Sequence, residues 1–218
     1  MHLTIAREVK EQFPELRVVV CIIRNVKVEK TSERLKKFIA QKLEDLRKRY
    51  STNDLQKIPV LKFYRDLLKQ TLGKDTSSVV ALVKRALGGE AFPIINNLVD
   101  ACNLAVAETL IAMGAFDLDK ISGDMILRLA VKGESFLEIG KKDPMELHGG
   151  EVIISDSRKI FSIPIYRDGE ETKISEETKY VALLALGVEE RELLNSIYLA
   201  MNYITEYCGG RGEVKLVL

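Results

Sequence analysis

The sequence predicts an α/β (or α+β) fold in which helices pack on a mixed β-sheet and a long C-terminal helix closes the structure. Apolar residues recur at helical spacing several times within residues 1–90 and again over residues 188–208. Residues 124–165 instead contain short β-like runs separated by glycine turns. Residues 18–23 are continuously apolar, which is typical of a strand at the centre of a sheet.

The chain begins with a predicted helix and a predicted strand. Residues 3–13 show the pattern of a short amphipathic helix that stops near Pro14, and residues 16–28 are mainly a strand. The next helix follows Thr31 or Ser32, because either hydroxyl can cap its first turn. Its apolar residues form one seam, with lysines and arginines on the opposite face.

Two further helices are predicted by their start and stop signals. The first begins at Pro59 and ends at Gly73. The second covers residues 79–87, between the hydroxyl residues 76–78 and a Gly-Gly pair at 88–89. The first ninety residues are therefore expected to be mainly helical, with little strand.

Residues 92–121 place polar side chains beside an apolar helical stripe. The stripe runs from Leu98 to Met113, and Gly114 is expected to end the helix. Asp100 and Asn103 are three residues apart, so on a helix they project from one face next to the stripe. Because buried polar groups need partners, this stretch is a candidate functional site.

The second half of the chain is predicted to contain most of the strands. An Asp-Gly pair at 168–169 indicates a hairpin between residues 160–166 and 171–174, and Pro164 implies an edge position or a bulge. The C-terminal helix ends at Gly209, with Tyr198 among its inward residues, and the tail could add one more strand. The remaining strands are predicted at residues 125–131, 135–139 and 151–156.

The composition fits one soluble globular domain that covers residues 1–218. Of the residues, 46% are hydrophobic and 30% are charged, and no long flexible linker divides the chain. No window reaches the eighteen apolar residues of a membrane span, and the N-terminus turns charged too early for a signal peptide. We therefore expect a cytoplasmic protein with no membrane contact, whose oligomeric state is left open.

The charge is unevenly distributed along the chain. Residues 1–90 contain 20 Lys and Arg against 11 Asp and Glu, whereas residues 91–218 contain 13 against 21. A basic part beside an acidic part could steer nucleic acid towards one face of the molecule. The alternative is an ordinary solvated helix surface.

Neither a metal site nor a cofactor site is predicted. Cys21, Cys102 and Cys208 are widely separated and the chain has two histidines, so no zinc-binding set can be assembled by spacing. The first two cysteines lie in apolar runs and are expected to be buried. Cys208 lies at a helix end and is the one candidate for an exposed thiol. Asp117 and Asp119 flank an apolar residue, which favours a structural role for at least one of them.

Six segments of the chain carry motifs in a distinctive order and spacing, at residues 97–104, 114–121, 123–128, 133–134, 150–156 and 174–179. In that order and spacing they resemble the B3/B4 domain, the tRNA-editing module of the β subunit of bacterial phenylalanyl-tRNA synthetase. The chain looks like a free-standing relative rather than a complete synthetase. The resemblance implies that residues 180–186, for which periodicity alone permits a helix, form a strand of the sheet.

The resemblance also implies a partner and a chemistry. The expected partner is tRNA or aminoacyl-tRNA, and the expected reaction is hydrolysis of the ester that joins a wrong amino acid to tRNA. Such an ester is already activated, so a positioned water can suffice without a covalent nucleophile or a cofactor. Two alternatives stay open: a tRNA- or RNA-binding module without catalysis, and a hydrolase or binder of small amino-acid esters.

The residues of the family's editing pocket match only in part. Its asparagine corresponds to Asn103, which is kept and is the catalytic candidate, to orient the water or bind the substrate carbonyl. Its histidine corresponds to Gly114. Its glutamate, which contacts the hydroxyl of a misattached tyrosine, corresponds to Leu184, and this argues against tyrosine as the substrate. Asp168 is the carboxylate at the matched positions that could pair with a substrate ammonium.

The candidate substrate-binding residues come from four parts of the chain. For Asp100, Asp117 and Thr178 a purely structural role as buried polar anchors is the alternative. The full set is Asp100, Gly114, Asp117, Arg167, Asp168, Gly169, Thr178 and Leu184.

Overall fold

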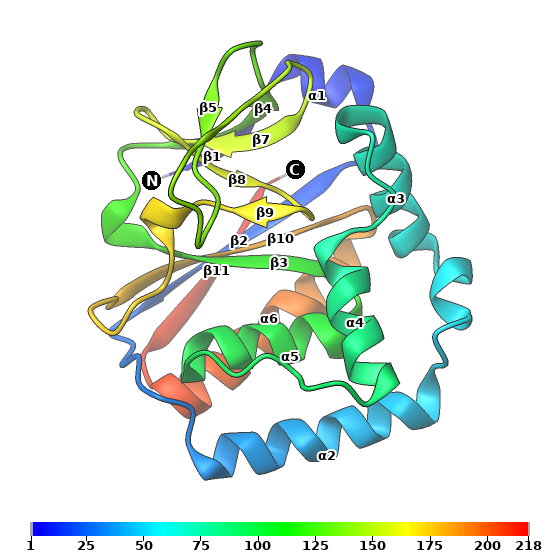
Figure 1. The fold of residues 1–218 in the computed structure, drawn as a ribbon. Coiled ribbons are helices and arrows are strands. Elements are labelled where there is room, and N and C mark those ends of the chain that lie inside the picture. The colour runs from blue at the N-terminus through cyan, green and yellow to red at the C-terminus, as the bar shows by residue number, and fades with distance from the viewer. Residues whose placement is uncertain (1, 218) are drawn as a thin grey trace.

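The computed structural model describes residues 2–217 as two packed β-sheets flanked by helices (Figure 1). The central sheet has four antiparallel strands in the order β11-β2-β10-β3. These strands are β2 (Arg17–Arg24), β3 (Ala112–Asp117), β10 (Tyr180–Gly187) and β11 (Arg211–Val217). The predicted tail strand is confirmed by β11, although Leu218 lies outside the described residues.

The second sheet has five strands in the order β1-β4-β7-β8-β9. Its β1–β4 pair is parallel and its other pairs are antiparallel, so the predicted mixed sheet is confirmed. The strands are β1 (Leu3–Ile5), β4 (Met125–Leu129), β7 (Val152–Ser155), β8 (Ile160–Ile163) and β9 (Arg167–Asp168). A separate two-stranded ribbon pairs β5 (Ser135–Phe136) with β6 (Met145–Glu146).

Helices α2, α5 and α6 lie on the side of the central sheet away from the second sheet (Figure 1), whereas α1 packs beside β4 of the second sheet. The long C-terminal helix α6 and helix α5 pack together on that face, and α2 lies outside them. On the other face, the rings of Phe116 and Phe161 meet edge to face with centroids 5.1 Å apart and join the two sheets. The helices are α1 (Arg7–Gln12), α2 (Glu33–Arg49), α3 (Pro59–Leu72), α4 (Ser78–Gly88), α5 (Asn97–Thr109) and α6 (Glu190–Cys208).

The predicted starts of α2 and α4 and the predicted ends of α3 and α4 are confirmed by their caps. The hydroxyls of Ser32 and Ser77 accept hydrogen bonds from backbone N–H groups in the first turns of α2 and α4. Gly73 and Gly89 end α3 and α4 in the left-handed conformation, which costs glycine little because it has no Cβ. The largest buried cluster draws on both halves of the chain, from Leu3 to Cys208.

Strand β10 is the element that periodicity alone left open. It pairs with β2 on one side and β3 on the other, and its residues from Val181 to Gly187 are buried. A strand buried on both faces does not alternate polar and apolar residues, and its apolar run is therefore compatible with either a helix or a strand. The prediction of a strand is confirmed.

Two predicted boundaries of secondary-structure elements are wrong. Residues 3–5 form β1 rather than the start of a helix, because their backbone pairs in parallel with β4. The helix α5 ends at Leu110, which adopts the left-handed conformation with φ 62°, and Gly114 lies inside β3. A glycine after an apolar stripe is a common end signal, but here it is required within a strand for packing.

The position predicted for the hairpin turn is wrong. Arg167 and Asp168 form β9 and pair with β8, with Asp168 opposite Ser162, so the chain reverses over residues 164–166 instead. Pro164 therefore lies in the turn. Tyr198, predicted to face inward from α6, is exposed because it lies on the outer side of the helix. Within residues 2–217, no helix combines the length and apolarity needed to cross a bilayer.

Candidate functional site

A cleft of about 710 Å³ opens at the free edge of β3, between the β8–β9 turn and helices α4 and α5. It brings together residues that lie far apart in the sequence. Five of the residues predicted for the site line it: Asn103, Gly114, Arg167, Asp168 and Leu184. Gly169 is not in the cleft lining, and a Cβ at this position would lie 2.9 Å from the backbone oxygen of Phe161.

Gly114 and Leu184 stand directly opposite each other in the antiparallel pair of β3 and β10. Side chains at opposite positions of a sheet share one face. The histidine and glutamate of the resembling pocket would therefore form one cross-strand pair, and both members of that polar pair are absent here. The wall that they would provide is apolar in this chain.

Packing around Gly114 leaves no room for a side chain. A Cβ at this position would lie 2.7 Å from the ring of Phe116, which is buried between the two sheets. Real Cβ contacts are never so short, so any other residue requires the ring to move. The glycine is thus needed by the fold of the cleft floor.

Asp168 presents a half-buried carboxylate to the cleft. Its Oδ1 accepts a hydrogen bond of 2.8 Å from the hydroxyl of Ser162, which lies opposite it on β8. Burial raises the pKa of Asp168 to about 6, although the hydrogen bond from Ser162 acts in the opposite direction. The carboxylate is therefore mainly ionised at neutral pH and can hold a cation in the cleft.

Asn103 faces the same cleft from α5. The first turn of this helix is capped by the side chain of Asn96, which accepts from the N–H of Val99. Within residues 2–217 the side-chain amide of Asn103 makes no hydrogen bond, and it lines the cleft. Its carbonyl oxygen and its NH₂ group are both free to contact a ligand.

The two arginines at the cleft differ in how they are held. Arg167 forms an ion pair of 2.7 Å with Glu138, and its guanidinium lies over the ring of Tyr166, 4.7 Å from the centroid. Arg85 of α4 also lines the cleft and makes no ion pair within the described part of the chain. Sequence reasoning missed Arg85, because a cation in the last helical turn is already explained by the helix dipole.

Asp100, Asp117 and Thr178 lie outside the cleft lining. The fully buried Asp100 accepts hydrogen bonds from the hydroxyl of Thr31 and from the N–H of Ile95, and burial raises its pKa. It therefore holds the loop before α5.

Asp117 and Thr178 form a separate buried pair. The hydroxyl of Thr178 donates to the carboxylate of Asp117 at 2.8 Å, and Lys120 approaches the same carboxylate at 3.5 Å. The pair ties the end of β3 to the segment before β10.

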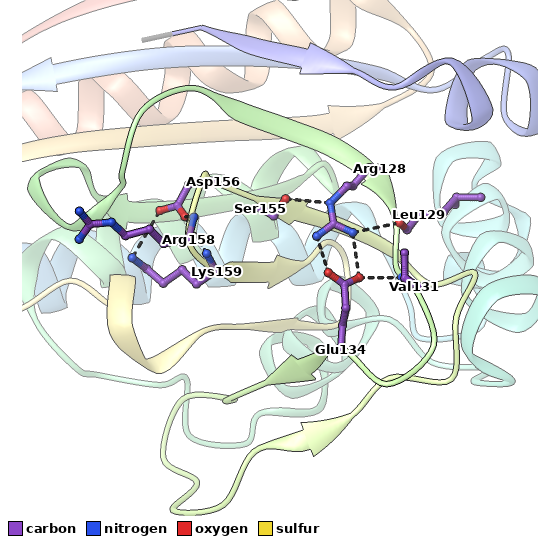
Figure 2. A network of polar contacts seen from close by, with 8 residues as sticks. All are labelled: Arg128, Leu129, Val131, Glu134, Ser155, Asp156, Arg158 and Lys159. Carbon is purple, nitrogen blue, oxygen red and sulfur yellow. Dashed lines mark hydrogen bonds and ion pairs between the residues drawn. The ribbon is translucent and has the colours of Figure 1, made fainter.

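A polar network in the second sheet also lies away from the cleft (Figure 2). Arg128 donates two hydrogen bonds to Glu134, of 2.8 and 2.7 Å, and a third of 3.0 Å to Ser155. Nearby, Asp156 accepts from three backbone N–H groups. Burial alone would raise the pKa of Asp156, but these N–H groups outweigh it and lower the pKa. The network holds two turns of the sheet.

Thiol and metal chemistry have little support from the geometry. Cys102 is a buried residue of α5 outside the cleft lining, and burial raises its pKa to about 12. Cys208, predicted to be exposed, is buried in the core, and burial raises its pKa to about 12 as well. Such thiols are not ionised at neutral pH. Among the described residues no group of three or more His, Cys, Asp or Glu side chains could hold a metal ion.

Comparison with known proteins finds similarity to phenylalanine–tRNA ligase beta subunits of several bacteria. The chain is 38% identical over 87 residues to the phenylalanine–tRNA ligase beta subunit of Fusobacterium nucleatum, over 40% of this chain and 11% of that protein. It is 32% identical over 101 residues to the corresponding subunit of Aquifex aeolicus, over 46% and 13%. The chain thus spans little more than a tenth of the length of these curated relatives.

The fold has a counterpart among solved structures. The N-terminal fragment of the phenylalanyl-tRNA synthetase beta subunit from Pyrococcus horikoshii matches 97% of this chain and 50% of that fragment. The TM-score is 0.53 and the identity is 15%, which shows likeness in fold alone. The model of the B3/4 domain matches residues 62–209, which include all the cleft residues named above. The chain therefore belongs to the B3/4 domain family.

Proposed function

We propose that this chain binds aminoacyl-tRNA and hydrolyses the ester of a mischarged tRNA in trans. The observation that carries the proposal is that one cleft of a B3/4 domain contains both a free amide, Asn103, and an ionised carboxylate, Asp168. These two groups complement the two polar ends of an aminoacyl ester, its carbonyl and its α-ammonium.

The reaction needs little more than positioning. In the proposed step a water oxygen bonds to the ester carbon, the bond from that carbon to the ribose oxygen breaks, and a proton of the water passes to the leaving ribose oxygen. The amide of Asn103 orients the water or contacts the carbonyl oxygen, and Asp168 pairs with the α-ammonium. Holding the reactants together supplies most of the acceleration, since the ester is already activated.

The apolar wall favours an amino acid without a polar side chain. Leu184, Met113 and Ile154 line the cleft, and no polar group stands at the Gly114–Leu184 pair. A buried tyrosine hydroxyl would have no partner at this wall, and leaving it unpaired costs roughly 1–3 kcal/mol. We therefore expect discrimination against tyrosine and acceptance of aliphatic amino acids.

The basic part of the chain supports a contact with the tRNA backbone. Helix α4 carries Lys84 and Arg85, and Arg85 reaches the cleft itself. Neither cation makes an ion pair within residues 2–217. Cations at the mouth of a cleft attract phosphates, and the resulting affinity falls steeply with salt.

A deacylation screen tests this proposal. The wild type and Asn103→Ala are incubated with tRNAs misacylated with aliphatic, small or aromatic amino acids. Asn202→Ala is the matched control, because Asn202 is exposed on α6. We expect hydrolysis of the aliphatic class, lost in Asn103→Ala and kept in the control. Release no faster than in buffer would refute the enzymatic function.

The absent polar pair favours a second candidate, a tRNA-binding module without catalysis. It predicts gel shifts that weaken with salt while the aminoacyl ester stays intact. Hydrolysis of free amino-acid esters as fast as of aminoacyl-tRNA would instead indicate a small-ester hydrolase.

A further inference from the structure

Strand β3 runs along the cleft with one edge unpaired. It is the last strand of the central sheet and pairs only with β10 within the described residues. Figure 1 shows it at the near edge of that sheet, between β9 on one side and helices α4 and α5 on the other. An edge strand presents backbone N–H and C=O groups that can pair with another extended chain.

The hydroxyl of Tyr64 reveals which backbone groups point to the free edge. It accepts from the N–H of Ala112 at 2.9 Å and donates to the C=O of Leu186 at 2.5 Å. Ala112 and Leu186 are opposite each other in the ladder. One oxygen can touch both groups only if they face each other, so Ala112 directs its backbone groups towards β10.

Alternation then assigns the remaining residues of β3. In an antiparallel pair, successive residues direct their N–H and C=O groups alternately towards and away from the partner. The backbone N–H and C=O groups of Gly114 therefore point towards β10, as those of Ala112 do. Those of Met113 and Ala115 point to the free edge. No hydrogen bond satisfies these outward groups within residues 2–217, and of the two residues only Met113 lines the cleft.

The free backbone of Met113 lies between the two polar groups of the cleft. On the side of the second sheet is Asp168, whose Oδ1 is 3.7 Å from the position of a Cβ on Gly114. On the helix side is Asn103 of α5, which packs against β3. A ligand that pairs with this edge thus meets a negative charge and a free amide.

We propose that the backbone of Met113 binds the aminoacyl group as one added residue of an antiparallel strand. Its C=O accepts from the α-ammonium, and its N–H donates to the ester carbonyl oxygen. One residue supplies both bonds, because opposite residues of an antiparallel pair exchange an N–H···O bond in each direction. The inference rests on the proposed function and deepens it.

The proposed contact has a catalytic and a selective consequence. Negative charge develops on the carbonyl oxygen during attack by water, and a fixed N–H aimed at that oxygen stabilises it. The C=O requires a donor at the α position, and Asp168 adds a charge that attracts an ammonium. The substrate class is therefore the α-aminoacyl esters, and α-hydroxyacyl esters are expected to be poor substrates.

Proline substitution tests the N–H directly. Met113→Pro removes it and keeps the C=O, and an edge strand tolerates proline. Met113→Ala controls for the side chain, and Ala115→Pro for a proline at an outward position that does not line the cleft. We expect kcat/KM of Met113→Pro to fall about 100-fold below that of Met113→Ala, as for a lost oxyanion donor. Equal values for these two variants would overturn the inference.

Amide hydrogen exchange on the wild type tests the role of the Met113 N–H even if the proline variant does not fold. The probe is an adenosine that carries leucine through a 3′-amide, which cannot be hydrolysed as an ester. At saturation we expect exchange of the Met113 N–H to slow at least roughly tenfold, as for a newly formed backbone hydrogen bond. Unchanged exchange on binding, or no binding, would refute the edge pairing. A wild type that binds this probe yet hydrolyses no mischarged tRNA would refute the proposed function alone.

Discussion

Replacing Asp168 with asparagine should stabilise this protein at neutral pH while weakening its cleft. Asparagine keeps an oxygen that can accept from Ser162, but it carries no charge to desolvate. Burial raises the pKa of Asp168 from 3.8 to about 6. That difference corresponds to about 3 kcal/mol, of which partial solvent exposure leaves an expected gain of about 1–3 kcal/mol.

The stability that Asp168→Asn gains over the wild type must increase as the pH rises. The folded state binds the proton of Asp168 more tightly than the unfolded state, so ionisation favours unfolding. This contribution to stability is complete below pH 3.8 and is lost as the pH rises through about 6. The difference in the free energy of unfolding between Asp168→Asn and the wild type should therefore grow between these two pH values and stay constant above pH 7.

Urea unfolding of both proteins from pH 4.5 to pH 8 measures this difference. Thermal unfolding should agree, with roughly 2–4 °C for each kcal/mol in a chain of this size. Asp143→Asn, which removes an exposed carboxylate, controls for net charge. The reasoning is refuted if the gap is the same at both ends of the range, or if Asp168→Asn is the less stable protein at pH 8. In the deacylation assay the variant should show a raised KM.

Three further substitutions test the architecture around the cleft. Tyr64→Phe should cost roughly 2 kcal/mol or more in urea unfolding, because two buried backbone groups lose the hydroxyl between them; an unchanged midpoint would contradict the assignment of the β3 edge. Gly114→His should lower Tm, since overpacking against Phe116 costs about 1–3 kcal/mol; a Tm equal to that of the wild type would show that the ring moves freely. Thr178→Val should leave Asp117 without its hydroxyl donor and destabilise the fold by about 1–3 kcal/mol. Its deacylation rate per folded molecule should stay unchanged, and a selective loss of rate would place the pair in the site.

Local signals in the sequence determined most of the secondary structure. The hydroxyl caps Ser32 and Ser77 and the glycine ends of α3 and α4 act within one helical turn, so neighbouring residues suffice to predict them. The apolar run of β2 likewise predicts a buried strand without knowledge of its partners. Motif order along the chain was enough to indicate the family and five of the residues that line the cleft.

The tertiary structure decided what depends on contacts between distant segments. Gly114 has the same local signal as a helix end, and only the ring of Phe116 and the pairing with Leu184 place it in a strand. Asp100 and Asn103 share a helix, yet one holds a loop and the other faces the cleft. The free edge at Met113 follows from strand order, which no local pattern encodes, because pairing in a sheet is set by burial over the whole chain.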